Sequence, residues 1–319
     1  MCITFKSFTK LLFIILLNLA FSNYFDLAAQ DINQSQLGRQ YYEQGEVEKA
    51  RNIFEKLAKN KNNVPLIHSV YLEILSSSDS KGFEEAVDYL EKVKKWYPNN
   101  FNYQADEALL YLNAGDNKKA DKVFNDLVES VKANPFLVRS TAQYFFHNGQ
   151  AEYAIQTYLE GRKASKNQAE YAIELANVYR RVNKKDAMIE EYLNFINQNP
   201  ENLAYVQNVM QNLLTETEDL ESLEAVLYDK IQKNPTNIVY NELLIWVNMQ
   251  LKNFYNAFIQ ARALDKRNNE GGKRLLDIGI MALHNKDFEN SAIIFEYVID
   301  NYKSGFNYEI ARRYLIKSR

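Results

Sequence analysis

The sequence has one cysteine, Cys2, among its 319 residues, and this scarcity excludes two kinds of stabilising site. A disulfide within the chain needs two cysteines, and a thiolate zinc site needs several, so neither can hold this fold together. The three histidines, His68, His147 and His284, are far apart in the sequence and form no paired metal-ligand motif. We therefore expect neither a metal nor a cofactor.

The chain also lacks a surplus of positive charge, with 38 Lys and Arg residues against 41 Asp and Glu. Binding along a phosphate backbone needs clustered basic residues, so no nucleic-acid partner is expected. Glycine-rich phosphate loops and nucleophile elbows are absent from the sequence as well, which predicts a protein that is not an enzyme. Acidic pairs such as Glu190 with Glu191 are interpreted as solvent-facing surfaces of helices.

What the sequence does contain is a repeat. The stretch GEVEKARNIF, which begins at Gly45, returns in variants at steps of 33 to 36 residues. The position of its small residue is occupied in turn by Ala50, Ala86, Ala120, Ala154, Ala187, Leu223, Ala257 and Ser291. A period held this closely is typical of stacked helical hairpins. The five prolines fall between the repeats, at Pro65, Pro98, Pro135, Pro200 and Pro235, so none interrupts a predicted helix.

The repeat resembles the tetratricopeptide-repeat family. The family pattern is matched by Leu37, Gly38, Tyr41, Gly45, Ala50 and Phe54, by Leu175, Ala176, Tyr179, Ala187, Tyr192 and Pro200, and by Ile278, Gly279, Ser291 and Phe295. The resemblance covers residues 31–303, about eight repeats of roughly 34 residues. It departs from the pattern in the sixth repeat, where Gln211 and Leu223 stand at positions that are usually small. It implies an all-α fold, a right-handed superhelical solenoid of helix-turn-helix units.

Both ends of the sequence differ from the repeats. Lys6 and Lys10 precede an apolar run, residues 11–19, and this order predicts a secretory signal peptide over residues 1–29. An uncleaved membrane anchor is the alternative, although nine residues are too few to span a bilayer. Cys2 precedes the apolar run, so the protein is not expected to be a lipoprotein. Residues 304–319 are expected to form a capping helix or the start of a ninth repeat.

The resemblance implies that the first helices of the hairpins line a concave groove that docks peptides or partner proteins. The pairs Ser35 with Arg39, Arg139 with Gln143 and Asn208 with Asn212 do not reproduce the Lys and Asn clamp with which some members grip a peptide carboxylate. Counting from the turns instead predicts an aromatic and polar groove. Its expected residues are Phe136, Arg139, Gln143, Phe146, Tyr205, Asn208, Asn212, Glu242, Trp246 and Met249.

Aromatic side chains with an Arg are the residue types that carry binding energy in protein interfaces. A register shift of one residue would instead place Trp246 or Phe146 in the core. The sequence therefore predicts a scaffold for other proteins, exported to the periplasm or the outer membrane, within an envelope assembly or secretion complex. Contact with the membrane face is expected only through a partner. The alternative is a periplasmic module that binds a peptide or a glycan.

Overall fold

The computed structural model describes residues 29–77 and 80–319, and every regular element within these ranges is a helix. The predicted all-α repeat fold is thereby confirmed. The expected signal peptide lies outside the described residues except for residue 29. No helix in the described ranges has the length and hydropathy needed to cross a bilayer.

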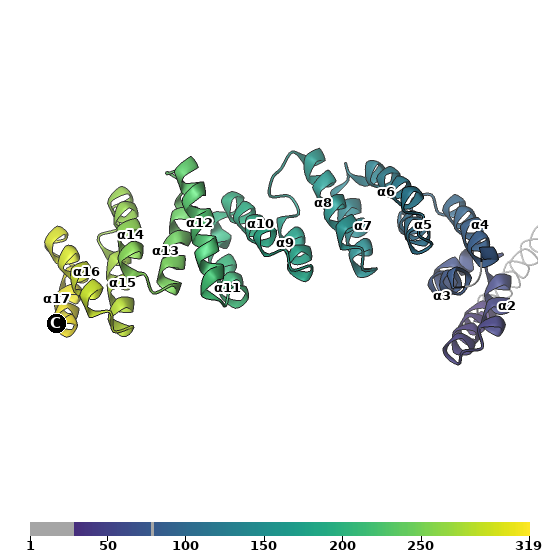
Figure 1. The fold of residues 1–319 in the computed structure, drawn as a ribbon, viewed down its shortest axis with the longest axis horizontal. Coiled ribbons are helices and arrows are strands. Elements are labelled where there is room, and N and C mark those ends of the chain that lie inside the picture. Colours follow the sequence, from purple (N-terminus) through teal and green to yellow (C-terminus); the bar gives the residue numbers. More distant parts are fainter. Residues whose placement is uncertain (1–28, 78–79) are drawn as a thin grey trace, which may run out of the picture. The chain divides into compact units, whose positions relative to one another are not determined.

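The helices follow one another as hairpins, each with a first and a second helix (Figure 1). The first hairpin pairs residues 29–43 with α2 (Val47–Leu57). The next are α3 (Val64–Ser76) with α4 (Ser80–Trp96), α5 (Asn102–Asn113) with α6 (Asn117–Val131), and α7 (Pro135–His147) with α8 (Ala151–Ser165). They continue as α9 (Ala172–Arg181) with α10 (Lys185–Gln198), α11 (Leu203–Leu213) with α12 (Thr217–Lys233), α13 (Ile238–Gln250) with α14 (Phe254–Asn268), and α15 (Lys273–His284) with α16 (Phe288–Asn301).

The chain divides into two compact units, Met1–Thr157 and Tyr158–Arg319. Each contains apolar clusters of its own, built from the facing sides of its hairpins. In the first unit Phe54, Ile67 and Leu90 are fully buried, and in the second Leu193 and Phe295 are. Burying one such side chain contributes about 1.5–3 kcal/mol, so packing between helices supplies most of the stability of each unit.

Six of the turns inside the hairpins share one backbone geometry. Each has a residue with positive φ: Gly45, Gly115 and Gly149 at 78–79°, and Asn183, Lys252 and Lys286 at 57–63°. At Lys286, for example, its own N–H donates to the carbonyl of Leu283, and the next N–H, of Asp287, donates to that of Ala282, both at 3.0 Å. This is the Schellman closure of a helix. Glycine adopts it without strain, whereas a residue with a Cβ pays a steric cost.

Small residues let the two helices of a hairpin approach closely, as the repeat predicted. A Cβ added at Gly38 would lie 2.7 Å from the ring of Phe54, and one added at Gly279 would lie 2.7 Å from the ring of Phe295. Both rings are fully buried. The aromatic ring therefore fills the space that the missing side chain leaves.

The interpretation of Glu191 as a solvent-facing residue was wrong. Its carboxylate is buried and accepts two hydrogen bonds from the guanidinium of Arg162, at 2.9 and 2.5 Å. The Nε of Arg162 donates to the carbonyl of Glu170 at 2.9 Å. The planar fork of an arginine matches both oxygens of a carboxylate, which is why this pair can be buried where α8 meets α10.

The last helix, α17 (Phe306–Ser318), packs against α15 and α16 and buries Ala311 completely. A first helix contacts the preceding hairpin in the same way, since α7 contacts both α5 and α6. The predicted cap and the predicted start of a ninth repeat both have this geometry. Phe306 and Ile316 of α17 stay exposed.

Candidate partner-binding surface

A hollow of about 280 Å³ opens on the first helices of three successive hairpins in the first unit, α3, α5 and α7. It holds two carboxylates, those of Glu73 and Asp106, and no Lys or Arg is among the described residues that line it. We call it the acidic hollow. Its lining residues are His68, Ser69, Leu72, Glu73, Ser76, Asp106, Leu109, Leu110, Asn113, Tyr144 and Asn148.

A chain of hydrogen bonds forms part of this lining. Nε2 of His68 lies 2.7 Å from the carboxylate of Asp106, and the hydroxyl of Tyr144 donates to the other carboxylate oxygen. The side chain of Asp106 is only 8% exposed. Burial, with the Asp106 charge adding to it, raises the pKa of the Tyr144 hydroxyl, so this group stays a donor at neutral pH. This chain of hydrogen bonds fixes the Asp106 carboxylate in place.

His68 is held from its other side as well. Its Nδ1 lies 3.3 Å from the hydroxyl of Tyr89, and its ring meets that of Tyr103 edge-on at 4.5 Å between centroids. A carboxylate can only accept, so in the neutral ring Nε2 carries the proton and Nδ1 accepts from Tyr89. Both nitrogens are therefore engaged. The arrangement suits positioning of Asp106 rather than proton transfer to a substrate.

A second hollow of about 520 Å³ lies at the start of α5 and α7. It is lined by aromatic, aliphatic and uncharged polar side chains, without a charged one among its described lining residues. We call it the aromatic hollow. Its lining residues are Trp96, Tyr97, Pro98, Asn99, Asn100, Phe101, Asn102, Phe136, Leu137 and Ser140. Phe136 is 74% exposed although it is a large apolar side chain.

The two hollows follow each other along the same two helices. On α7 the lining residues Phe136, Ser140, Tyr144 and Asn148 recur every four residues, counting Asn148 just after its end, so they lie on successive turns. On α5, Asn102 lines the aromatic hollow and Asp106, one turn later, lines the acidic one. Together the hollows form one surface on α3, α5 and α7.

The four groove residues predicted on α7 take different positions. Phe136 lines the aromatic hollow. Gln143 is exposed but lines neither hollow, and Arg139 is half-buried. Phe146 is half-buried, with its ring 6.2 Å from that of His147. The structure thus brings one of the four to the surface described above.

The predicted groove residues of the second unit are also divided. Tyr205, Asn208 and Asn212 are exposed on α11, where the Asn212 amide donates to the carbonyl of Asn208 at 2.7 Å. Trp246 and Met249 are half-buried and pack against apolar cores. These two side chains therefore contribute to packing. For Trp246 this is the core position that a register shift of one residue would give it.

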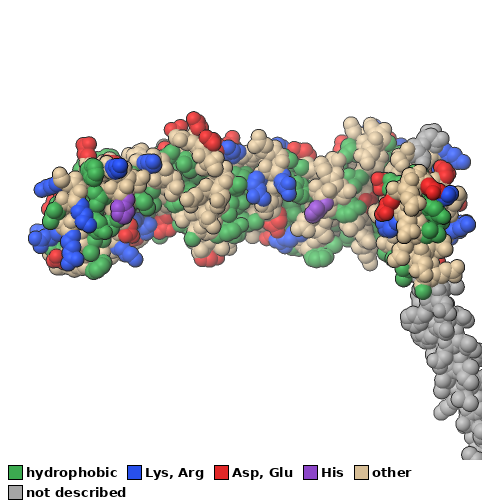
Figure 2. All heavy atoms as spheres, turned by 90° about the horizontal axis from the view of Figure 1, so that it is seen from below, with side chains coloured by type: hydrophobic (Ala, Val, Ile, Leu, Met, Phe, Trp, Pro, Cys, Tyr) green, Lys and Arg blue, Asp and Glu red, His purple; other side chains and the backbone are tan. Residues whose placement is uncertain are grey.

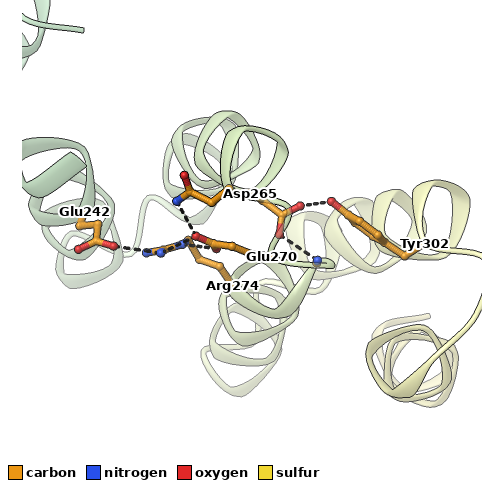
Figure 3. Close-up of polar contacts among 7 residues, drawn as sticks. Glu242, Asp265, Glu270, Arg274 and Tyr302 are labelled. Atoms are coloured by element: carbon orange, nitrogen blue, oxygen red, sulfur yellow. Dashed lines mark hydrogen bonds and ion pairs between the residues drawn. The ribbon is translucent and has the colours of Figure 1, made fainter. Parts of the chain in front are cut away.

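Glu242, the remaining predicted residue, belongs to a polar network in the second unit (Figure 3). Arg274 on α15 donates to Glu242 on α13 at 3.1 Å and to Glu270 at 2.9 and 3.0 Å. The hydrogen bond from Arg274 lowers the pKa of Glu270. Beside it, burial raises the pKa of Asp265, which accepts from the hydroxyl of Tyr302. Glu242 is thus engaged in joining two first helices.

Charge elsewhere is mixed. On the face drawn in Figure 2, lysine and arginine side chains are interspersed with aspartate and glutamate. No group of three or more potential metal ligands from His, Cys, Asp and Glu occurs in the part of the chain that the structure describes.

His68 and Asp106 were not among the predicted groove residues. A signal for them exists in the spacing: His68, Asp106 and Tyr144 follow one another at 38 residues. That is one repeat of 34 residues plus one helical turn of about four. Equivalent positions of two repeats are about 34 residues apart, so comparing them alone does not reveal the hydrogen bonds among His68, Asp106 and Tyr144.

The tetratricopeptide repeat family matches residues 34–60, which cover most of the first hairpin and the turn after it. The match supports a tetratricopeptide-repeat protein. No curated protein matches the chain. Among solved structures, a tetratricopeptide repeat protein from Parabacteroides merdae is 12% identical, with 91% of this chain and 99% of that one covered and a TM-score of 0.27.

Two further solved structures are similar to the chain. The TPR domain of P58(IPK) is 14% identical over 89% of this chain and 77% of that one, with a TM-score of 0.24. A structure of Naa15/Naa10 bound to HypK-THB is 17% identical over 90% of this chain and 50% of that one, with a TM-score of 0.36. The similarity to the tetratricopeptide repeat family rests on residues 34–60, and the hairpins show a helical repeat fold.

Proposed function

We propose that the protein is a non-enzymatic scaffold that holds a segment of a partner protein against α3, α5 and α7. The observation that carries the proposal is the succession of the aromatic and the acidic hollow along the same helices. An elongated surface with a large exposed ring, Phe136, suits a chain that lies along it. Aromatic anchors that become fully desolvated on binding carry much of the binding energy of such interfaces.

The size of the acidic hollow also favours a protein segment. Sites for small molecules usually have 300–1,000 Å³ and enclose most of their ligand. The acidic hollow, at about 280 Å³, is at the small end and suits one side chain of a partner. A segment that fills both hollows makes better use of the surface than a compact ligand does.

The proposal extends to an exported protein in an envelope assembly or secretion complex, with any contact to the membrane face made by the partner. Lys6 and Lys10 ahead of the apolar run of residues 11–19 support export. Fusing residues 1–29 to a reporter that is active only after export tests this part. Activity that disappears when two residues of the apolar run are changed to Asp is the expected result. Activity that persists, or never appears, contradicts export.

Site-specific photo-crosslinking tests the binding surface. A photoreactive side chain at Ser140, which lines the aromatic hollow one helical turn before Tyr144, should link to a defined partner in the native extract. The matched control carries the same group at Asp88, an exposed position on the second helix α4. A partner linked equally from both positions, or from neither, would refute a docking site on α5 and α7.

A periplasmic module for a peptide or a glycan is the second candidate. The uncharged lining of the aromatic hollow favours it, because aromatic faces and amide groups can hold a neutral ligand. Recovery of a small ligand by mass spectrometry from purified protein, with loss of that ligand in Phe136→Ala, would favour this candidate over the scaffold.

A further inference from the structure

The two hollows differ in charge, and this difference constrains what can occupy them. The acidic hollow offers the carboxylates of Glu73 and Asp106 without a Lys or Arg among its described lining residues. The Asp106 carboxylate is held by donors from His68 and Tyr144. A basic side chain entering the hollow would form charge-assisted hydrogen bonds with these oxygens, whereas an acidic one would be repelled.

The aromatic hollow has the opposite preference. None of its described lining residues carries a charge, and Phe136 presents its ring largely to solvent. An apolar or aromatic side chain covering that ring removes apolar surface from water, at roughly 25 cal/mol per Å². A charged side chain there would lose its hydration without finding a counter-charge.

The helix geometry sets the distance between the two sites. Tyr144 follows Phe136 by eight residues on α7, and Asn148 follows Ser140 by eight. At 1.5 Å per residue, the centres of the hollows are about 12 Å apart along the helix. An extended chain covers roughly 3.3 Å per residue, so about three or four positions of a partner segment span that distance.

From these three observations we infer that the partner segment is extended and carries an Arg or Lys three or four positions from an apolar or aromatic residue. The basic side chain enters the acidic hollow and the apolar one covers Phe136. This inference rests on the proposed scaffold function, and it adds the chemistry and the spacing of the partner.

Selection from a library of random displayed peptides against the full chain without residues 1–29 tests the inference. Enriched peptides should combine an Arg or Lys with an apolar residue at a separation of three or four. In a selected peptide, changing the basic residue to Glu should weaken binding about tenfold or more, while Arg→Lys should keep most of it. Enrichment of acidic peptides, enrichment without this spacing, or no enrichment would overturn the inference.

Two protein variants separate the inference from a loss of folding. Glu73 is exposed, so Glu73→Gln should fold normally, and it should weaken binding of a selected basic peptide about two- to fivefold. The same variant should bind the Arg→Gln form of that peptide as wild type does. Equal effects on both peptides would contradict a charge contact. Because the crosslink from Ser140 does not depend on peptide charge, it reports on the scaffold function separately.

Discussion

Tyr144 donates a hydrogen bond to Asp106, a residue that lies 38 positions earlier and is almost completely buried. Nε2 of His68 makes the second contact to the same carboxylate. The bond crosses from one hairpin to the preceding one, so it bears on the stability of the first unit as well as on the shape of the acidic hollow.

Tyr144→Phe should destabilise the protein by about 1–3 kcal/mol, because the buried carboxylate loses one of its two donors. The matched control is Tyr153→Phe, which removes a hydrogen bond to the exposed Asp121 at 2.7 Å and should cost less than about 1 kcal/mol. Urea unfolding followed by circular dichroism measures both. Equal costs for the two variants would show that burial of Asp106 adds nothing.

Gly279→Ala should destabilise the second unit although alanine favours helices. The added methyl group would lie 2.7 Å from the buried ring of Phe295, and overpacking of this kind costs about 1–3 kcal/mol. The gain in helix propensity, about 1 kcal/mol, only partly offsets that cost. Thermal unfolding of Gly279→Ala, Phe295→Leu and the double variant measures the coupling. Additive effects would contradict a direct steric conflict.

Lys252→Gly should raise the stability by up to about 1 kcal/mol. Lys252 has a φ of 58°, and a left-handed conformation costs an L-residue about 1–2 kcal/mol. The greater freedom of glycine in the unfolded chain, about 0.5–1 kcal/mol, takes part of the gain away. Ala263→Gly, at an exposed position inside α14, is the control and should destabilise by about 1 kcal/mol. A melting temperature of Lys252→Gly below that of wild type would show that the left-handed backbone at Lys252 is not strained.

Glu270→Gln should make the protein less sensitive to acid. The hydrogen bond from Arg274 lowers the pKa of Glu270 from its ordinary value of 4.5, so its stabilisation is present above pH 4.5. That stabilisation is lost as the pH falls through the lowered folded-state value. The expected result is a shallower fall in melting temperature below pH 4.5 than in wild type. An unchanged acid limb would show that this ion pair is not linked to folding.

Asp265→Asn should change the pH dependence of stability in the opposite direction. Burial raises the pKa of Asp265 above its ordinary 3.8, so its favourable contribution is present below that value and is lost as the pH rises through the folded-state pKa. The melting temperature of the variant minus that of wild type should therefore be larger at pH 7 than at pH 3. A difference from wild type that is the same at both pH values would contradict the raised pKa.

The hairpins could be predicted from the sequence because each repeat carries local signals at a fixed period. Ala50 and Ser291 mark the close approach of two helices, and both are fully buried. Half of the shared turns could not be found from glycine, since Asn183, Lys252 and Lys286 occupy the same backbone position. Backbone hydrogen bonds fix that geometry, and they are common to all residues with an N–H.

Of the predicted groove residues, Phe136 alone is among the described residues that line the two hollows. An error of one residue in the register of a helix changes which side chains are exposed. Trp246 is an example, because it packs against a core. The acidic hollow depends on contacts between hairpins, such as that of His68 with Asp106, whose spacing of 38 residues differs from the repeat period. Glu191 is buried for the same reason, because its partner, Arg162, comes from another hairpin.

The hydrogen-bond chain from Tyr144 through Asp106 to His68 also affects how the first unit opens. In a stacked array each hairpin touches only its neighbours, so hairpins can unfold one at a time from an end. Opening any one of these three hairpins breaks a hydrogen bond to the buried Asp106 carboxylate, which lowers the stability of the other two hairpins. Amide hydrogens of α3, α5 and α7 should therefore exchange with solvent as one cooperative block.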